Sequence, residues 1–227
     1  MRLALETSTR LGSLAIGEDG RLIAECNLSV RAVHSETVLP EVERMLRRAG
    51  AAPGDLEAVV VGAGPGSFTG VRIAAALAKG LRFALDRPLF AYSSLAAVAG
   101  GIGPAGVWAL FDARRGEVYA AAYRIEDDPA PVAGPMVSSI EAVLGSIDDP
   151  RAWRFAGEGA IRHAERLREA GATVLPPHLG IPRASSLLWL ADRWPEAGRV
   201  LDPTRWEPSY VRASGAERQG PRDVARA

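Results

Sequence analysis

The sequence of 227 residues can bury a core as one domain or as two domains of about 100 residues each. Hydrophobic residues make up 48% of it, which excludes a largely disordered chain. The 27 basic and 27 acidic side chains cancel, so the chain lacks the excess positive charge with which a protein that binds nucleic acid alone neutralises phosphates, and we expect any RNA contact to need a partner.

Three short apolar runs open the chain and predict three β-strands, the second and third joined by a tight turn. The turn is Asp19-Gly20, a dipeptide that favours hairpins. A helical pattern follows, with apolar residues on one face and Gly50 as a C-terminal stop. The expected strands span residues 3–7, 11–18 and 22–29, and the expected helix spans residues 35–49.

The next part of the chain predicts a parallel arrangement. A short β-branched run ends at Gly62 and predicts a buried strand, and a second helix, a strand and a short helix follow it. Three antiparallel strands that continue into parallel strands joined by helices are typical of a mixed sheet. These later elements are expected at residues 58–61, 69–85, 89–92 and 94–99.

After residue 100 the pattern starts again. A strand at 107–112 ends in Asp112, as the first strand ends in Glu6, and a polar turn leads into a strand at 117–124. Because this unit of strand, acid, turn and strand occurs twice, the sequence suggests a duplicated fold. The remainder predicts a loop at 127–150 with a weak helix near 139–144, a strand at 153–157, helices at 160–170 and 185–194, and disorder after Arg212.

A glycine-rich loop, Gly64–Arg72, lies between a predicted strand and a predicted helix. Such a loop can hold a phosphate, because free N–H groups and the helix dipole both favour an anion. It lacks the Lys-Ser/Thr pair of a Walker A loop and the later acid of a dinucleotide-binding fingerprint. Alternatively, the glycines only form a tight turn, Ser67 or Thr69 caps the helix, and Phe68 packs.

Glu6 and Asp112, the acids that end the two strands, also have either a binding role or a purely structural role. They could hold a cation together across the cleft in which a nucleotide would sit, or each could cap its own turn by accepting backbone hydrogen bonds. The residues that would face a nucleotide or phosphate are Glu6, Thr7, Ser8, Gly64, Gly66, Ser67, Asp112 and Arg114. No catalytic set and no metal site is predicted, because His34 has no second histidine nearby and His163 and His178 are expected to be exposed.

The second predicted helix has more apolar surface than one sheet face can cover. Its polar residues form one narrow stripe from Arg72 to Asp86. Small residues spaced by four form a shallow row that lets another helix approach closely, unless the helix at 35–49 fills it. The predicted partner surface consists of Val38, Val42, Met45, Ile73, Ala76, Gly80, Phe83 and Ala84.

Two further features bear on the compartment. The single cysteine, Cys26, excludes an internal disulfide and a cysteine-rich zinc site, which fits a reducing environment. The first apolar run meets Glu6 too early for a signal peptide, and no apolar run approaches the roughly 18 to 20 residues of a membrane span. We therefore expect a cytoplasmic protein that makes no membrane contact.

Several motifs together resemble the TsaB (YeaZ) family. The most specific are the glycine-rich loop and the segment Asp112–Tyr119; between about residues 127 and 185 the resemblance is weak. The family usually has aspartate where this chain has Glu6. The other motifs are Glu6–Thr9, His34–Glu36, Lys79–Leu81, Ser93–Leu95 and Pro208–Arg212.

The resemblance implies a duplicated α/β fold of the actin-like, sugar-kinase and Hsp70 class (ASKHA, RNase H-like), with mixed sheets flanked by helices. It also implies an accessory, non-catalytic subunit that supports a TsaD-like catalytic subunit, together with a TsaE-like ATPase. That complex transfers threonylcarbamoyl to N6 of the adenosine next to the anticodon, in tRNAs that read codons beginning with A.

The same resemblance implies that tRNA is bound only through the complex. The chain would have no cofactor of its own, and any ATP or ADP would be bound by the complex. Without its partner, the same surface is open to two-fold self-association. We divide the chain into an N-terminal domain at 1–100, which carries the partner-binding helices, and a degenerate C-terminal domain at 101–227, with a polar tail after about residue 213.

Two other classes of function remain as alternatives. One is an active small-molecule kinase or metal-dependent hydrolase of the same fold that uses Glu6 and Asp112. The other is an independent RNA-binding module, against which the neutral charge counts, together with the lack of interleaved basic and aromatic residues in the sequence.

Overall fold

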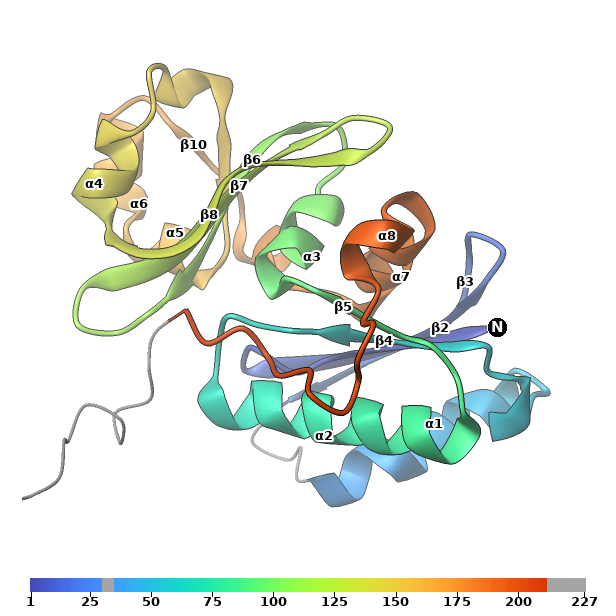
Figure 1. Cartoon of the computed structure of the whole chain (residues 1–227). Coiled ribbons are helices and arrows are strands. Elements are labelled where there is room, and N and C mark those ends of the chain that lie inside the picture. The colour runs from blue at the N-terminus through green and yellow to red at the C-terminus, as the bar shows by residue number, and fades with distance from the viewer. Residues whose placement is uncertain (30–34, 212–227) are drawn as a thin grey trace, which may run out of the picture.

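The computed structural model describes residues 1–29 and 35–211. The expectations for His34 and for disorder after Arg212 therefore lie outside the described residues. Within them, the chain forms two five-stranded mixed sheets flanked by helices (Figure 1). No described helix is long and apolar enough to cross a membrane.

The first sheet confirms the predicted meander and its parallel continuation. It consists of β1 (Arg2–Glu6), β2 (Leu11–Glu18), β3 (Arg21–Ser29), β4 (Ala58–Gly62) and β5 (Leu89–Tyr92). The strand order is β3-β2-β1-β4-β5, in which β1 pairs antiparallel with β2 and parallel with β4. Asp19 and Gly20 form the hairpin turn with φ angles of 49° and 73°, the left-handed backbone that such turns require.

The second sheet repeats the first. It consists of β6 (Ala105–Asp112), β7 (Glu117–Ile125), β8 (Pro129–Ser139), β9 (Arg154–Ala156) and β10 (Thr173–Val174). Its order is β8-β7-β6-β9-β10, and β6 pairs antiparallel with β7 and parallel with β9. Because strand order and strand directions match those of the first sheet, the duplicated actin-like fold is confirmed.

The prediction of a loop over residues 127–150 was wrong, because strand β8 occupies much of this segment. β8 is an edge strand that pairs with β7. It contains several prolines, which an edge strand tolerates because one row of its N–H groups needs no partner in the sheet. The pairing is irregular near Ala122, and most side chains of β8 are at least partly exposed, so the sequence lacks the apolar alternation of a strand.

Eight α-helices lie in the described part of the chain, in layers that alternate with the sheets. They are α1 (Ser35–Arg48), α2 (Phe68–Leu85), α3 (Ser94–Gly100), α4 (Ile140–Gly145), α5 (Glu158–Arg162), α6 (Ala164–Glu169), α7 (Ala184–Arg193) and α8 (Pro195–Gly198). Figure 1 shows α1 and α2 on one side of the first sheet and α3, α7 and α8 between the sheets. The single helix expected at 160–170 is divided into α5 and α6 at His163.

Each helical layer closes a separate core. The central core joins both sheets to α3 and α7, and includes Val60 and Phe111. A second core lies between the first sheet and helices α1 and α2, and a third lies between the second sheet and helices α4 to α6. The packing of the second core therefore determines which residues of α2 stay exposed on the outside.

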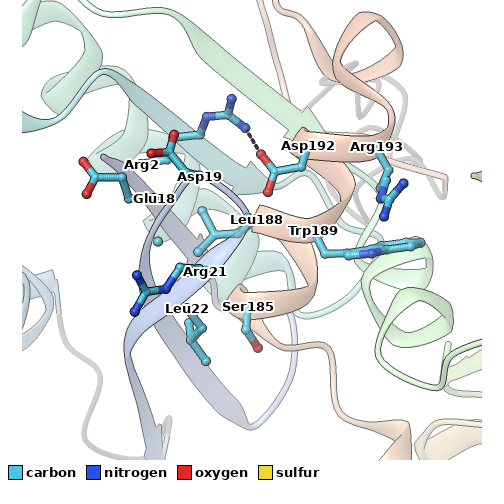
Figure 2. Close-up of a pocket in the computed structure, with 12 residues that line it drawn as sticks. Arg2, Glu18, Asp19, Arg21, Leu22, Ser185, Leu188, Trp189, Asp192 and Arg193 are labelled. Atoms are coloured by element: carbon cyan, nitrogen blue, oxygen red, sulfur yellow. Dashed lines mark hydrogen bonds and ion pairs between the residues drawn. The ribbon is translucent and has the colours of Figure 1, made fainter. Parts of the chain in front are cut away.

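Helix α7 follows the second sheet in the sequence but packs against β1, β2 and β4 of the first. Arg2 of β1 forms an ion pair with Asp192 of α7, beside a hollow of about 180 Å³ (Figure 2). The amide of Ala184, at the start of α7, donates to Ser13 Oγ at 2.9 Å. The division at residue 100 separates the strands of the two sheets but not their helices, and as a domain boundary it stays a prediction.

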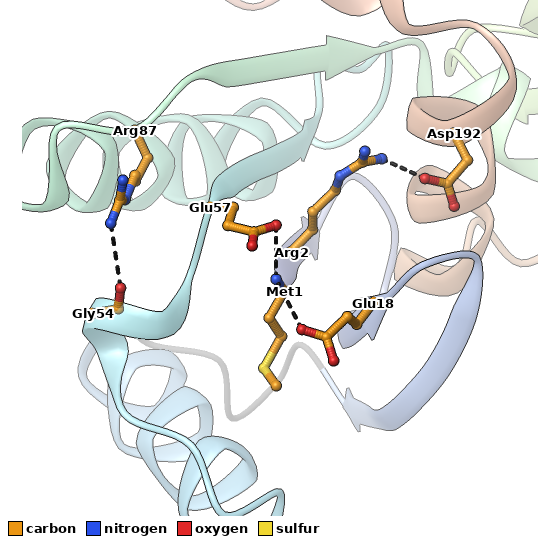
Figure 3. A network of polar contacts seen from close by, with 7 residues as sticks. All are labelled: Met1, Arg2, Glu18, Gly54, Glu57, Arg87 and Asp192. Carbon is orange, nitrogen blue, oxygen red and sulfur yellow. Dashed lines mark hydrogen bonds and ion pairs between the residues drawn. The ribbon is translucent and has the colours of Figure 1, made fainter.

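A polar network joins β1 to the neighbouring segments (Figure 3). The α-amino group of Met1 lies 2.9 Å from Glu57 Oε2 and 3.3 Å from Glu18 Oε1. Beyond Glu57 in the same view, a guanidinium nitrogen of Arg87 donates to the carbonyl oxygen of Gly54 at 3.4 Å. The two Met1 contacts link the start of β1 to β2 and to the segment that precedes β4, and the Arg87 contact joins that segment to the residues after α2.

After α8 the chain returns across α2. We call residues 202–211 the strap; Figure 1 shows it running beside α2. Lys79 Nζ of α2 donates to the Thr204 carbonyl oxygen at 3.3 Å, and the Ser209 amide donates to the carbonyl oxygen of Ala63 at 2.9 Å. The strap thereby joins α2 to the start of the glycine-rich loop.

Candidate functional site

Glu6 ends β1 and is completely buried. Its Oε1 accepts a hydrogen bond from the Ser8 amide at 2.6 Å, and its Oε2 accepts one from the Ser94 hydroxyl at 2.7 Å. Burial raises the pKa of Glu6, against the opposing effect of these hydrogen bonds. The side chain fits because Gly62 faces it: a Cβ there would come within 2.0 Å of Oε2. Glu6 therefore fixes a turn.

Asp112 plays the same local role at the end of β6. Its Oδ1 accepts a hydrogen bond from the Arg114 amide at 2.8 Å, two residues along, as Glu6 does from Ser8. Its Oδ2 accepts one from Arg162 at 2.8 Å. Both strand-ending acids thus cap their turns, which was one of the two roles that the sequence left open.

The glycine-rich loop packs directly on the first of these turns. A Cβ on Gly70 would lie 1.9 Å from the Thr7 carbonyl oxygen, and one on Gly66 would lie 2.3 Å from the Ser8 carbonyl oxygen. Thr7 Oγ1 donates to the Gly70 carbonyl at 2.7 Å, and Ser67 Oγ caps α2 by accepting from the Gly70 amide at 3.4 Å. The glycines therefore allow two backbone segments to touch.

A cavity of about 410 Å³ lies between the two turns. The structure brings five of the eight predicted phosphate-facing residues to its wall: Ser8, Gly66, Ser67, Asp112 and Arg114. Glu6 and Thr7 are buried outside that wall, and the carbonyl of Gly64 accepts a hydrogen bond from the Ser94 amide at 2.8 Å. The role of these residues toward a nucleotide or phosphate stays a prediction.

Other residues of this wall were not among those predicted to face a phosphate. They are Thr9, Arg10, Phe68, Thr69, Ala113, Tyr119 and Glu158. Glu158 comes from the start of α5, far along the chain in a segment with no recognised motif. The only sequence signal for it was its place directly after Gly157, whose φ of 106° marks a sharp turn into that helix.

In a duplicated actin-like fold, a nucleotide and a cation would sit in the cleft between these turns. The acids do not fit that use, because both oxygens of Glu6 accept hydrogen bonds in a buried position and Asp112 is paired with Arg162. Among the residues that the structure describes, no group of three histidine, cysteine or acidic side chains could hold a metal ion.

Helix α2 presents small and apolar residues on the outside of the described chain. Nothing lies within 4 Å of a Cβ built on Gly80, and Phe83 is 81% exposed. Ala76 and Ala84 are exposed as well. We call these four residues the α2 row. Within the described residues α1 leaves the row open, so the alternative that α1 fills it was wrong.

Three residues of the predicted partner surface need a correction. Val38, Val42 and Met45 of α1 are at most 4% exposed and belong to the core under the first sheet, so they are not free surface. An amphipathic pattern shows which face of a helix is apolar, but it does not show what covers that face. Ile73 is half-buried, and the α2 row remains as candidate surface.

Known proteins similar to this chain identify its family. A family model described as TsaD, tRNA N6-adenosine threonylcarbamoyltransferase, matches residues 29–180. The tRNA threonylcarbamoyladenosine biosynthesis protein TsaB of Escherichia coli is 30% identical, over 96% of this chain and 97% of its own length. The chain belongs to the TsaB family. The protein of the same name from Bacillus subtilis is 32% identical over 95% of each chain.

Solved structures of the TsaB family agree. YeaZ from Pseudomonas aeruginosa is 34% identical, with a TM-score of 0.79, over 92% of this chain and 98% of that one. A second crystal structure, of a protein described as similar to peptidase YeaZ from Pseudomonas aeruginosa, is 35% identical with a TM-score of 0.82 and covers 93% and 99%. The resemblance predicted from the motifs is thus confirmed along nearly the whole chain.

Proposed function

We propose that this chain is a non-catalytic subunit of the complex that transfers threonylcarbamoyl to N6 of the adenosine next to the anticodon, in tRNAs that read codons beginning with A. Its role is to bind and support a TsaD-like catalytic subunit. Full-length similarity to TsaB proteins supports the pathway. The observation that carries the subunit role is the open α2 row.

The α2 row has the shape and chemistry of a helix-docking surface. Ala76, Gly80 and Ala84 are small, so a second helix can approach the α2 backbone closely. Phe83 beside them is 81% exposed, and burying a side chain of this size is worth roughly 1.5–3 kcal/mol. A partner helix on this row would therefore gain stability without any rearrangement of the core.

The non-catalytic character is supported by the state of the two acids. Glu6 and Asp112 are used in turns, which also disfavours the alternative of a kinase or metal-dependent hydrolase. The family model that matches part of the chain is described by a transferase activity, whereas the relatives that match its whole length are TsaB proteins. In this proposal the transferase chemistry belongs to the partner.

The remaining parts of the proposal follow from the same role. A TsaE-like ATPase completes the assembly, tRNA is bound only through the complex, and the chain carries no cofactor of its own, so ATP or ADP would be bound by the complex. In the absence of its partner, the α2 row is open to a two-fold homodimer. The chain works in the cytoplasm with tRNA as the substrate of the complex.

Gel filtration of the chain mixed with the TsaD-like protein of the same genome tests the proposal. The two should elute as one complex, and Gly80→Leu should abolish it, because overpacking a close crossing costs roughly 1–3 kcal/mol. Gly145→Leu is the matched control, since nothing lies within 4 Å of a Cβ on that glycine and α4 is in a different layer. An intact Gly80→Leu complex contradicts the interface.

A turnover assay tests the enzymatic alternative. The purified chain alone should hydrolyse no ATP and should transfer no group to small acceptors, with or without added Mg²⁺. If it does turn over and Asp112→Asn removes that activity, the chain is an enzyme and the proposal fails. Asp149→Asn, at an acid that only caps a short 3₁₀ turn, is the control for unspecific effects.

A further inference from the structure

The strap and α2 line a groove of about 550 Å³ that includes one end of the α2 row. Ala75 and Ala76 of α2 line it together with Phe68, Trp206 and Tyr210. Because Ala76 belongs to both, a helix that packs along the α2 row and continues toward the start of α2 reaches this groove.

Two basic side chains of α2 line the same groove and are positioned by aromatic rings. The Arg72 guanidinium lies 3.6 Å from the centre of the Phe68 ring, and its Nε donates to the Tyr210 hydroxyl at 3.0 Å. The Lys79 ammonium lies 5.9 Å from the centre of the Trp206 ring. Rings and hydroxyls orient these charges but do not neutralise them, since they carry no full negative charge.

Neither Arg72 nor Lys79 forms an ion pair with any residue that the structure describes. Further along α2, by contrast, Arg82 lies 3.8 Å from Asp86. Glu207 is the one acidic side chain that lines the groove, and within the described chain it pairs with neither base. Two bases and one acid leave the groove with a net charge of +1.

The charge indicates which kind of occupant fits. In a two-fold homodimer both copies bring the same surface, so each adds the same surplus of positive charge to the contact. A different partner can instead bring carboxylates, and complementary charges strengthen and orient such a contact. Small residues of the row favour a helix as the structure that carries them.

We infer that this groove binds carboxylate side chains, aspartate or glutamate, of the partner helix that docks on the α2 row. The inference rests on the proposed function and adds to it the chemistry by which the partner is recognised. Arg72 and Lys79 are the specificity residues, Ala75 and Ala76 are the apolar surface between them, and the rings of Phe68, Trp206 and Tyr210 hold both bases in place before binding.

Charge reversal at Lys79 tests this inference, with the TsaD-like protein of the same genome as the probe. Lys79→Glu should weaken binding about tenfold or more at low salt, and at about 0.5 M KCl the difference should shrink, because salt screens exposed charges. Lys79→Arg keeps the charge and should bind like the unaltered chain. Affinity is measured by titration calorimetry at both salt concentrations.

Two controls separate the charge at Lys79 from other effects of the substitution. Arg168→Glu reverses an exposed charge on α6, which lies in a different layer from the groove, so it should leave affinity unchanged. Trypsin cleavage after Arg205, in the strap, reports whether Lys79→Glu has released the strap from α2. Cleavage at the rate of the unaltered chain, together with the weakened and salt-sensitive binding, supports the inference.

Each of the remaining outcomes refutes either the carboxylate contact or the proposed function. If Gly80→Leu abolishes binding while Lys79→Glu binds normally, the carboxylate contact is refuted and the proposed function stands. Equal weakening by Lys79→Glu and Lys79→Met at both salt concentrations also refutes it, because the lost contact is then apolar. If neither Gly80→Leu nor Lys79→Glu weakens binding, the α2 row is not the interface and the proposed function fails with it.

Discussion

Gly62→Ala should destabilise the chain because it places a methyl group where the Glu6 carboxylate lies. The new Cβ would sit 2.0 Å from Glu6 Oε2 and 3.1 Å from Ser94 Oγ. The carboxylate cannot swing into solvent, since Glu6 is completely buried and held at both oxygens. Overpacking costs typically 1–3 kcal/mol, and the loss of a hydrogen bond to a charged group costs about 1.5–3 kcal/mol more.

Gly62→Ala should therefore lower the free energy of unfolding by about 3 kcal/mol or more. For a chain of this length, a loss of about 3 kcal/mol corresponds to a fall of roughly 6–12 °C in Tm. Glu6→Asp shortens the side chain by one methylene group and withdraws the carboxylate from Gly62. In the double variant the overpacking is relieved, so the combined loss should be about 1–3 kcal/mol smaller than the sum of the single losses.

Urea unfolding of the four proteins in this double-mutant cycle measures that coupling. Gly80→Ala is the control: its new Cβ meets nothing within 4 Å, and alanine is favoured over glycine inside a helix by roughly 0.5–1 kcal/mol, so stability should stay equal or rise. If the losses at positions 62 and 6 add to within about 0.5 kcal/mol, the contact between Gly62 and Glu6 does not govern either position.

Three further outcomes are expected. Burial raises the pKa of Glu6 in the folded state. The stability that this group contributes is therefore complete below its ordinary pKa of 4.5 and is lost as the pH rises through its folded-state pKa. Unfolding measured between pH 4 and 8 should show the unaltered chain losing stability relative to Glu6→Gln. Glu25→Ala should cost about 1–3 kcal/mol in urea unfolding, because its carboxylate accepts the Ser185 hydroxyl at 2.8 Å, whereas the exposed Glu43→Ala should cost under about 0.5 kcal/mol. Phe83→Ser should leave Tm nearly unchanged but weaken capture of the TsaD-like protein, and equal capture would contradict the role of the α2 row.

Most strands could be predicted because their local signals agree with their environment. The run Ala58–Val61 is apolar throughout, and the structure buries it on both faces of the first sheet. The Asp19-Gly20 turn needs positive φ angles that few other dipeptides adopt easily. The two strand-ending acids also showed the duplication, since the same turn geometry follows Glu6 and Asp112.

Strand β8 and the strap could not be predicted because their structure is imposed by their neighbours. β8 takes its register from β7 and exposes most of its side chains, so no apolar alternation marks it in the sequence. The strap has no regular element; it is placed by single contacts such as Ser209 to Ala63 and Arg72 to Tyr210. Contacts between residues so far apart in the chain leave no local pattern.

The same limit explains why only part of the predicted partner surface is exposed. Val38 and Phe83 are both apolar residues on helices beside the first sheet, yet one is 1% and the other 81% exposed. Hydrophobic periodicity does not distinguish core from interface, since both require an apolar helix face. In α2 the useful signal was the width of the apolar surface, which exceeds what one sheet face can bury.

The turns that follow Glu6 and Asp112 also explain why we propose a role for the outer surface of α2 and none for the cleft between the turns. One oxygen of each carboxylate accepts a hydrogen bond from the amide two residues along the chain. The second oxygen accepts one from Ser94 in the case of Glu6 and from Arg162 in the case of Asp112. A shared cation would need oxygens of both carboxylates at the wall of one cavity, and Glu6 does not line the cavity that Asp112 lines. Replacing Arg162 would release Asp112, but Glu6 would stay completely buried under Gly62 and Ser94. Freeing Asp112 would therefore still leave Glu6 outside the cavity, whereas the α2 row is already exposed in the described chain.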